Sequence, residues 1–562
     1  MTGEEPFDVL ILGGGSAGCV LAARLSEDPA RRVALVEAGP DLSDDAARAS
    51  AYPGRASFRP GTVWPGLSAR FGAAGRNDPG ARPEAPYAQA RLLGGGSALN
   101  GLGANRGAPE DYDEWAALGA TDWDWAGVAP YFRRLKRDLD IADAHHGTDG
   151  PIPVRRPPQG EASRFAQAAA AALAARGAPW RADQNGAWED GLFPIALNLD
   201  EAWTRVSAAR GYLTPAVRAR DNLAILAGTE ARRILFEDSR AVGALVVRDG
   251  AERRLHARET VICAGALHTP ALLQRSGIGP AAVLSALDAA VVAVREGVGE
   301  NLLEHPAAGV AAFLPRGSRA AEGSHHIPVV VRFSSGLADA PPGDMHCAIM
   351  ARAAWHPVGR RLGMLFVWVN KSVSRGRVRA TPSGLDVDFR LLSDPRDRTR
   401  LAAGFRRAAA ALTDAAAAGA CGAPFPALPS ARARRFASPS LGAVAATSLA
   451  ALALDLAGSR VPGFAATLAG APAPLATLLA DADRLDAFLD AAATGVWHAC
   501  GTCRMGAQGD PAAVTDPTGR VHGVEGLRVC DASLFPSIPC ANLNLPVMMT
   551  AERMADLMRG RA

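Results

Sequence analysis

The sequence predicts an α/β fold built on a dinucleotide-binding unit, with further lobes beside it. Residues 6–39, PFDVLILGGGSAGCVLAARLSEDPARRVALVEAG, have the pattern of an apolar strand, a glycine turn, a helix and a second apolar strand. The chain has 562 residues, which is too long for one ordinary domain. We therefore expect two or three cooperating lobes with room for a ligand between them.

The glycines of the first turn follow the pattern G-x-G-x-x-G. Gly13 permits the tight turn, Gly15 lets a pyrophosphate approach the backbone, and Gly18 lets helix and strand pack closely. The helix N-terminus favours the phosphate charge. Glu37 ends the second strand nineteen residues after Gly18, where it can accept hydrogen bonds from a ribose diol. This combination predicts binding of FAD or NAD and argues against a 2′-phosphate.

Helix and strand patterns continue along the chain. Segments 160–176 and 398–420 have helical period, and short β-like runs such as LAILAG, AVGALVV and TVICAG lie between them. The apolar stretch at 440–480 is interrupted by Asp455, Arg460 and several prolines. We expect packed or surface helices joined by Pro-Gly turns there and no membrane span, while a peripheral amphipathic contact stays open.

Composition narrows the choice of partners and location. Acidic and basic residues nearly balance at a net charge of +3, and no stripe of lysine and arginine runs along the chain, so we expect no nucleic-acid partner. The start, MTGEEPFDVLILGGGSAG, lacks the basic region and cleavable apolar stretch of a secretory signal. The eight cysteines follow no repeating framework. Both features favour a reduced, cytoplasmic location.

A second glycine cluster, ARLLGGGSALNGLGANRG, lies at 90–107. Consecutive glycines followed by Ser97 and Asn100 predict a backbone that comes close to a flat ligand and aims hydrogen-bond donors at it. A flexible surface loop is the alternative. The leucines beside the glycines favour a buried loop, and therefore the ligand.

The chain resembles the glucose-methanol-choline (GMC) family of FAD-dependent oxidoreductases from end to end. The family's first signature is similar to RLLGGGSALNGLGANRGAPEDYD, and its second to GALHTPALLQRSGIG at 265–279. Further matches are HHGTDGPIPV, GVGENLLEHP, HACGTCRMG and VCDASLFPSIPCANLNLPVMMTAERMADL. Within the family, the stretches ANRGAPEDYDEW, WDWAGVAPYF, SAARGYL, VWVNK, LLSDPRD and GVWHA resemble the hydroxymethylfurfural and aryl-alcohol oxidases.

The resemblance implies an α+β architecture with a bound FAD. A Rossmann-like FAD domain is expected from 1–157, 210–310 and 490–562, and a substrate domain of antiparallel sheet and helices from 158–209 and 311–489. Some members attach the flavin to a histidine just before the glycine loop, where YAQARLLGGGS has Tyr87 and no histidine, so we expect non-covalent FAD. The expected FAD contacts are Gly13, Gly15, Ser16, Gly18, Glu37, Ala38, Arg91, Gly95, Gly96, Asn100, Gly101, Ala264, Asp531, Ala532, Asn542 and Asn544.

Alcohol oxidation by a flavin requires removal of the hydroxyl proton and transfer of a hydride from the carbinol carbon. A neutral imidazole suits the first event near neutral pH. The family's catalytic histidine corresponds to His498 in VWHACG, and its partner in the motif CANLNLP to Asn542. An amide can hold the substrate oxygen without competing for the proton. Asn544 is the second choice for this role and is expected to contact the flavin instead.

Pocket walls are implied by the resemblance at Phe366, Trp368, Val496 and Trp497. Aromatic walls suit a flat aryl or furan alcohol, although each residue could instead be an ordinary core residue. The loop after Asn100 has the sequence GLG, where furfural-type oxidases are expected to carry bulkier residues. A roomier pocket and a larger alcohol therefore stay open.

The other ten histidines are expected to be mostly structural or surface residues. We expect no metal site, because neither H-x-x-H nor H-E-x-x-H occurs.

The leading hypothesis is FAD-dependent oxidation of a primary aryl or furan-type alcohol to the aldehyde, with His498 as the base, and onward to the acid through the aldehyde hydrate. The acceptor would be O2, which would give H2O2, or a quinone-like molecule, as in choline or alcohol dehydrogenases. Cys500 and Cys503 in C-G-T-C have the spacing of a redox pair, so a flavin-linked thiol oxidase is the alternative from another class. A flavoprotein scaffold or light sensor is a third.

Overall fold

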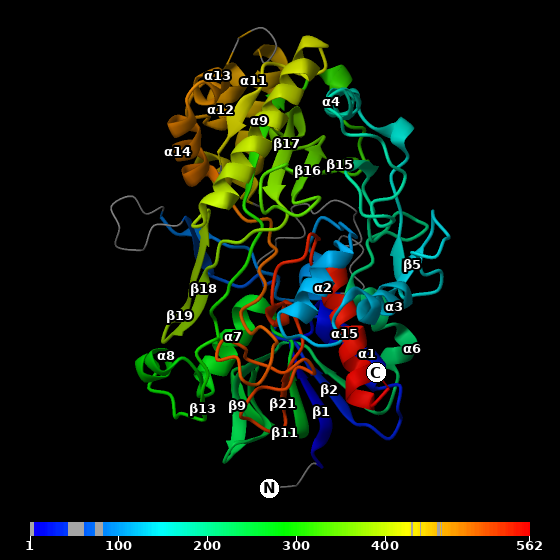
Figure 1. The fold of residues 1–562 in the computed structure, drawn as a ribbon, viewed down its shortest axis with the longest axis vertical. Helices are drawn as coiled ribbons and strands as arrows, with labels where there is room; N and C mark the ends of the chain where they lie inside the picture. Colours follow the sequence, from blue (N-terminus) through cyan, green and yellow to red (C-terminus); the bar gives the residue numbers. More distant parts are fainter. Residues whose placement is uncertain are drawn as a thin grey trace.

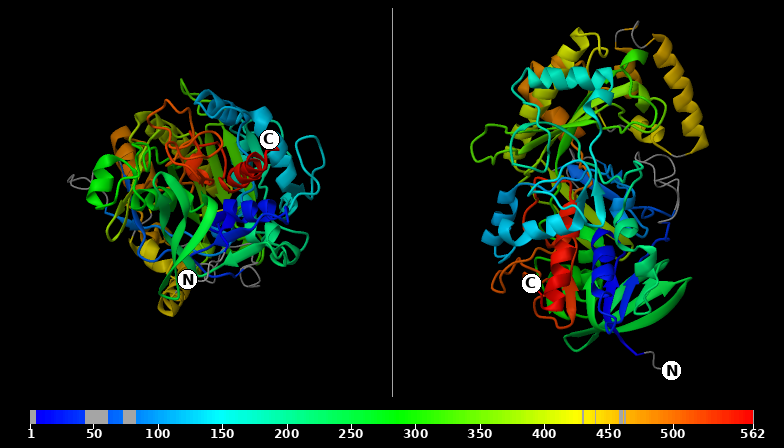
Figure 2. Two further views of the ribbon diagram at one scale, coloured as in Figure 1. Left: turned by 90° about the horizontal axis from the view of Figure 1, so that it is seen from below. Right: turned by 90° about the vertical axis from the view of Figure 1, so that its right-hand side faces the viewer.

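The computed structural model describes residues 5–42, 61–72, 83–428, 431–438, 440–457, 461 and 463–561. Two lobes lie end to end along the long axis of the molecule (Figure 1). The N-terminal strand and the C-terminal helix both lie in the lower lobe, which the side view of Figure 2 also shows. Each lobe is organised around its own sheet.

The lower sheet contains the dinucleotide-binding unit that the sequence predicts. Its strands are β1 (Phe7–Leu12), β2 (Val33–Val36), β8 (Leu223–Leu226), β9 (Thr229–Glu237), β10 (Arg240–Arg248), β11 (Ala251–Ile262) and β21 (Leu527–Val529). They are ordered β8-β2-β1-β11-β10-β9, and β21 pairs with the end of β11. The second half of β11 is parallel to β1, whereas its first half is antiparallel to β10. All pairs around β1, β2 and β8 are parallel, as in a Rossmann-like domain.

Helices α1 (Ser16–Leu25) and α15 (Asn544–Arg559) pack against each other in this lobe. Their apolar residues belong to one large core with the strands, which explains why β1 and β2 are near-continuous apolar runs. The turn between β1 and α1 therefore lies next to the start of α15, although 528 residues separate Ser16 from Asn544. The C-terminal motif is brought to the glycine motif in this way.

The upper sheet is wholly antiparallel, in the order β20-β14-β17-β16-β15-β7. Its strands are β7 (Gly191–Pro194), β14 (Ala307–Phe313), β15 (Val329–Phe333), β16 (Met345–Met350), β17 (Leu362–Val369) and β20 (Phe425–Ala427). Helices α4 (Arg164–Ala174) and α9 (Pro395–Ala417) cover one face, where Leu365 and Val367 pack into their core. Phe366 and Trp368 alternate with these residues and belong to a separate cluster on the other face.

A smaller sheet connects early and late parts of the chain. It contains β3 (Ser68–Gly72), β4 (Ala85–Pro86), β18 (Arg377–Thr381) and β19 (Gly384–Leu391) in the order β18-β19-β3-β4. This sheet joins segments that the sequence assigns to different domains, and β14 crosses the expected boundary between 310 and 311. The two-domain architecture is confirmed, whereas its boundaries stay a prediction.

The remaining helices and strands connect or cover these sheets. The helices are α2 (Pro109–Ala117), α3 (Trp125–Leu135), α5 (Ala208–Tyr212), α6 (Pro215–Arg218), α7 (Gly265–Arg275), α8 (Ala281–Ala286), α10 (Ala431–Phe436), α11 (Leu441–Ala457), α12 (Phe464–Ala469), α13 (Leu475–Leu479) and α14 (Ala482–Ala492). The strands are β5 (Lys136–Asp138), β6 (Ile152–Val154), β12 (Ile278–Gly279) and β13 (Ala293–Val294). The helices expected within 440–480 are thus present as α11 to α13. Among the described residues, no helix has the length and apolarity needed to cross a bilayer.

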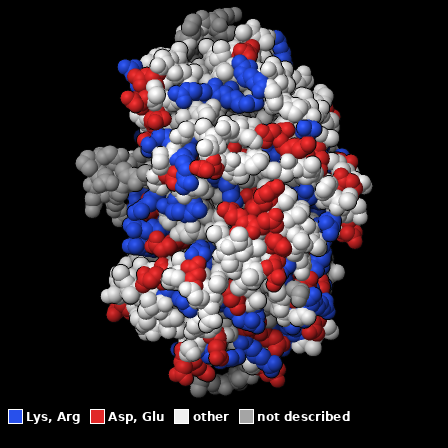
Figure 3. Space-filling view, in the orientation of Figure 1, with Lys and Arg blue, Asp and Glu red and all other residues white. Residues whose placement is uncertain are grey.

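Acidic and basic side chains alternate over the face shown in Figure 3, without a broad field of either sign. This mixed surface agrees with the nearly balanced composition of the chain.

Candidate active site

The glycines of the first motif have the packing that the motif requires. Gly13 has a φ of +116°, and a Cβ added there would lie 2.4 Å from the carbonyl oxygen of Cys263. A Cβ on Gly18 would lie 1.9 Å from the carbonyl oxygen of Gly13, so the helix can approach the turn only because residue 18 is glycine. A Cβ on Gly15 would meet nothing closer than 4.0 Å. The turn is therefore tight on its inner side and open at Gly15.

The second glycine cluster packs directly on the first. The amide of Gly94 donates to the carbonyl oxygen of Gly14 at 2.7 Å, and a Cβ on Gly95 would lie 2.7 Å from the Cα atom of Gly15. A Cβ on Gly96 would meet no atom within 4 Å. The two loops form one cradle with exposed backbone, which confirms the buried-loop interpretation of residues 90–107.

Glu37 lies at the end of β2 with its carboxylate turned toward the glycine turn. One oxygen accepts from the amide of Gly14 at 2.9 Å and the other from the amide of Gly39 at 2.7 Å. Burial raises the pKa of Glu37, while these two N–H groups favour its charged form. Glu37 therefore orders the turn itself. Its contact with a ribose, like the role of neighbouring Ala38, stays a prediction.

Asn100 and Arg91 shape the cradle with their side chains. Asn100 Oδ1 accepts from the amide of Leu102 at 3.1 Å and from Arg205 Nη1 at 3.0 Å. The guanidinium of Arg91 lies over the ring of Trp64, 5.2 Å from its centroid. A Cβ on Gly101 would lie 3.8 Å from the ring of His326, so this glycine marks the approach to the upper lobe.

The C-terminal motif closes the cradle from a third side. Asp531 accepts from the amide of Gly265 at 2.8 Å, which fixes Ala264 and the start of α7 beside Ala532. Ser16 Oγ donates to Asn544 Oδ1 at 2.9 Å, and Asn544 Nδ2 donates to Asn198 Oδ1 at 3.2 Å.

The cradle has the features that FAD requires. Asn198 Nδ2 is buried and makes no hydrogen bond among the described residues, so it can donate to a ligand. Gly15 caps α1 without a side-chain cap, which leaves the helix N-terminus open to phosphate. The backbone at Gly15 and Gly96 is open as well. These residues fit a dinucleotide as the sequence predicts.

His498 and Asn542 meet between the two lobes. Asn542 Nδ2 lies 3.3 Å from His498 Nε2, and Asn542 Oδ1 lies 3.5 Å from Asn105 Nδ2. His498 Nδ1 lies 2.9 Å from Nδ1 of His305. Burial lowers the pKa of His498 to about 3, so its imidazole is neutral near neutral pH.

This network selects one tautomer of His498. An amide nitrogen can only donate, so Nε2 of His498 accepts from Asn542 and carries a lone pair. The ring proton is then on Nδ1, which donates to Nδ1 of His305. The nitrogen of His498 that carries the lone pair thus lies beside an amide that can also hold an oxygen.

Glu304 fixes the backbone of His498. Its two carboxylate oxygens lie 2.9 and 2.8 Å from the amide of His498, and one also accepts from the amide of His305 at 2.9 Å. Burial raises the pKa of Glu304 to about 8, and the hydrogen bonds from backbone N–H groups, which favour the carboxylate, only partly oppose this rise. A Cβ on Gly495 would lie 2.7 Å from this side chain. Sequence reasoning missed Glu304 and His305, although both lie in the quoted motif GVGENLLEHP.

Three of the four expected pocket residues lie together. Phe366, Trp368 and Val496 belong to one apolar cluster on the inner face of the upper sheet, and the Trp368 ring stacks on His346 at 4.2 Å. Trp497 is apart from them. Its side chain is 60% exposed, its backbone is left-handed at a φ of +63°, and its ring lies 6.2 Å from that of Tyr87.

Cys500 and Cys503 are free thiols in the buried core. Burial raises the pKa of both thiols well above the ordinary value. A thiolate is the reactive form in dithiol chemistry, so this environment is that of packing residues.

Two clusters of possible metal ligands occur within the described residues: Glu304, His305 and His498, and Asp143, His146 and Asp183. The first is joined by the hydrogen bonds given above. In the second, His146 Nε2 contacts Asp183 at 2.8 Å and Arg156 pairs with the same carboxylate at 2.8 Å. These ligand atoms already have protein partners.

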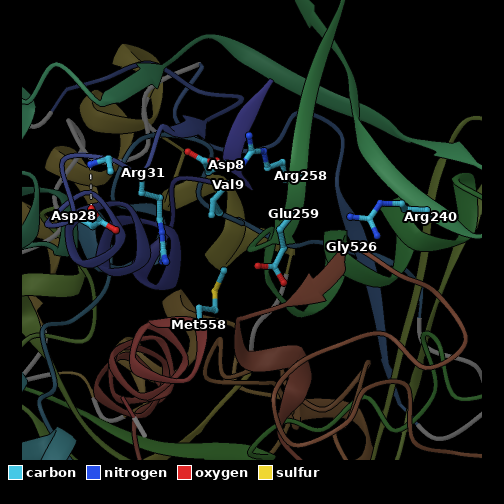
Figure 4. A pocket seen from close by; sticks show the side chains of 10 residues that line it. Asp8, Val9, Asp28, Arg31, Arg240, Arg258, Glu259, Gly526 and Met558 are labelled. Carbon is cyan, nitrogen blue, oxygen red and sulfur yellow. Dashed lines mark hydrogen bonds and ion pairs between the residues drawn. The ribbon is translucent and has the colours of Figure 1, made fainter. Parts of the chain in front are cut away.

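A surface hollow lies at the opposite end of β1 from the glycine turn (Figure 4). Acids and arginines line it, and Arg258 pairs with Asp8 at 3.3 Å. None of the expected site residues lies there.

Comparison with known proteins agrees with this geometry. Two GMC oxidoreductase models match residues 7–307 and 372–551. The 5-(hydroxymethyl)furfural oxidase of Methylovorus sp. (strain MP688) is 43% identical over 98% of both chains. An oxygen-dependent choline dehydrogenase of Stenotrophomonas maltophilia (strain K279a) is 32% identical over 100% of this chain and 96% of its own.

Solved structures share the fold over the whole length. Pyridoxine 4-oxidase from Mesorbium loti superposes with a TM-score of 0.77 at 29% identity, covering 99% of this chain and 100% of its own. A fungal aryl-alcohol oxidase superposes with a TM-score of 0.72 at 19% identity over 99% of both chains, and this likeness concerns the fold alone. The chain belongs to the GMC oxidoreductase family and is an FAD-dependent enzyme.

Proposed function

We propose that the enzyme oxidises a primary alcohol of aryl or furan type to the aldehyde, with His498 as the base and Asn542 as the residue that holds the substrate oxygen. The observation that carries the proposal is the lone pair of His498 Nε2 beside the amide of Asn542, 3.3 Å away. The 43% identity to a 5-(hydroxymethyl)furfural oxidase supports the substrate class.

His498 acts on the hydroxyl proton in this proposal. The pKa of His498, lowered to about 3, keeps the ring neutral, and Nε2 can accept the proton as the carbinol hydrogen leaves. Asn542 Nδ2 donates to the alcohol oxygen and orients it, and the ring proton on Nδ1 stays bound to His305. FAD, when bound, supplies the hydride acceptor.

The expected FAD contacts at Gly13, Gly15, Glu37 and Asn544 are part of the proposal, as is non-covalent binding. Tyr87 lies near the point where some members carry a flavin-linking histidine, and Tyr87 is buried against Phe389 and Trp497.

The apolar wall of Phe366, Trp368 and Val496 favours a flat apolar substrate. An aldehyde hydrate presents the same hydroxyl group to His498, so onward oxidation to the acid follows from the same geometry. We propose O2 as the acceptor, with H2O2 as the second product. A quinone-like acceptor is the alternative, and the 32% identity to choline dehydrogenases described as oxygen-dependent favours oxygen.

A thiol oxidase using Cys500 and Cys503 is disfavoured, because both thiols are buried and their pKa values are raised.

Anaerobic mixing of the holoenzyme with a panel of alcohols, aldehydes and thiols tests the proposal through the flavin absorbance. Furan and benzyl alcohols should bleach the flavin rapidly, and admission of air should restore the oxidised spectrum with release of H2O2. Bleaching by thiols but not by alcohols would refute the proposed substrate class. If the oxidised flavin spectrum recovers slowly in air but rapidly when a quinone is added, the acceptor is a quinone and not oxygen.

A further inference from the structure

Helix α11 carries an apolar face that no described residue covers. Its exposed leucines are 73% (Leu441), 72% (Leu449), 54% (Leu452) and 62% (Leu456) accessible. At about 100° per residue these four side chains fall within a sector of about 80°. Thr447, Ala451 and Leu454 are buried on the opposite side, where the helix packs on the upper lobe. A helix that is apolar all round is normally buried all round.

The helix stands on the outer side of the upper lobe. The side view in Figure 2 shows it in gold along the lateral edge of the upper lobe. Exposed leucines in such a row form a contiguous apolar surface, and surfaces of this kind mark contacts with a protein or a membrane.

The charges on the described residues near this helix are mostly basic. Arg432, Arg434 and Arg435 are exposed on α10, which packs against α11. The one acidic residue between 431 and 480 is Asp455, whose side chain is 6% exposed and pairs with Arg319 and Arg361. The exposed acid Glu322 pairs with Arg360 on a turn that contacts α11, so basic residues still outnumber acidic ones near the helix. An apolar helix face beside exposed arginines is complementary to an anionic lipid surface.

The size of the face argues against a second copy of the chain as its partner. A helix of 17 residues is about 25 Å long and about 10 Å wide, so its exposed face covers only about 250 Å². Stable protein interfaces bury about 800 Å² on each partner. An interfacial helix needs no more than such a strip, because only its apolar side inserts, to a depth of about 5–10 Å, between the headgroups and the acyl chains.

We propose that α11 attaches the upper lobe to an anionic lipid surface. The leucines of α11 insert among the acyl chains, and the arginines of α10 lie against the phosphate headgroups. The enzyme is then a peripheral membrane protein, with its FAD cradle in the lower lobe held away from the bilayer.

Cosedimentation of the full-length holoenzyme with vesicles tests this inference without use of activity. The probes are pure phosphatidylcholine and phosphatidylcholine with about 30% phosphatidylglycerol, at about 0.1 M and about 0.5 M salt. The protein should bind the anionic vesicles at low salt. Binding to neutral vesicles at low salt, and to both kinds of vesicle at high salt, should be much weaker. No binding to anionic vesicles would overturn the proposal.

Matched variants separate the two contributions. Leu449→Gln/Leu452→Gln should lower the partition coefficient roughly 100-fold. Val291→Gln/Val294→Gln alters two valines that are 63% and 51% exposed elsewhere on the surface and should change nothing. Arg434→Gln/Arg435→Gln should weaken binding to anionic vesicles only, whereas Arg253→Gln/Arg254→Gln, on an exposed part of β11, should not.

Folding and self-association are controlled in the same samples. The leucine variant should keep its FAD content and thermal midpoint, and Leu441→Gln/Leu456→Gln replaces it if it does not. The proposal would be overturned if the wild type sediments as a dimer and does not bind vesicles while the leucine variant is monomeric. That result would assign the face to a protein partner. Equal loss of lipid binding in the valine control would also overturn it.

Discussion

Replacement of His305 by phenylalanine is expected to slow reduction of the flavin by an alcohol about 10- to 100-fold while leaving the fold intact. His305 Nδ1 accepts the Nδ1 proton of His498 at 2.9 Å, and this contact keeps the lone pair on Nε2 beside Asn542. Phenylalanine fills the same volume without an acceptor. The buried N–H of His498 then has no partner, or its proton moves to Nε2 and faces the donor amide of Asn542.

The magnitude follows from the cost of an unsatisfied buried donor, which is about 1–3 kcal/mol. A shift of about 1.4–2.7 kcal/mol against the reactive tautomer corresponds to the 10- to 100-fold loss of rate. The loss should fall on the limiting rate of reduction at saturating alcohol rather than on the apparent Kd, because His305 acts through His498 and not on the substrate.

Anaerobic stopped-flow reduction measures both quantities. His305→Asn should recover most of the rate, because its Oδ1 can accept from Nδ1 of His498. His356→Phe, which removes another buried histidine that packs against Phe436, is the control and should reduce at the wild-type rate. An asparagine variant as slow as the phenylalanine variant, or a phenylalanine variant within twofold of wild type, would refute the reasoning.

Three further outcomes are expected. Cys500→Ala/Cys503→Ala should retain full alcohol oxidation in a peroxide-release assay, and loss of turnover with bound FAD intact would revive the dithiol alternative. Acid precipitation should leave all the flavin in the supernatant, whereas a yellow pellet would show a covalent bond. The pKa values of His346, His325 and His356 are lowered from the ordinary 6.5 to about 3, 4 and 4. As the pH falls, these rings therefore become protonated in the unfolded chain before they do so in the folded protein. The free energy of unfolding in urea should therefore decrease from about pH 6.5 to pH 4, by up to about 1.4 kcal/mol per pH unit for each ring, partly offset by Glu304, whose pKa is raised. A urea midpoint that is constant over this range would contradict this expectation.

The dinucleotide site could be predicted because its signals are local. Gly13, Gly15 and Gly18 follow one strand within a few residues, and Glu37 ends the next, so one β-α-β unit contains the whole pattern. Family resemblance then supplied the lobe of antiparallel strands, which no periodicity of the chain specified.

The network around His498 could not be predicted in the same way. His305 and His498 are 193 residues apart, and their contact arises from pairing between Leu303 and Cys500. Trp497 is adjacent in sequence to Val496 but its left-handed backbone turns its ring toward Tyr87. Position within a motif therefore indicated which residues gather at the site, whereas their hydrogen-bond partners depend on the assembled fold.

The rate of flavin reduction in His498→Ala tests the central claim most directly. With a furan or benzyl alcohol under anaerobic conditions, and with FAD content equal to wild type, removal of the base should lower this rate by roughly 100- to 10,000-fold. Reduction at the wild-type rate would show that another group accepts the hydroxyl proton, and the proposed role of His498 would be wrong.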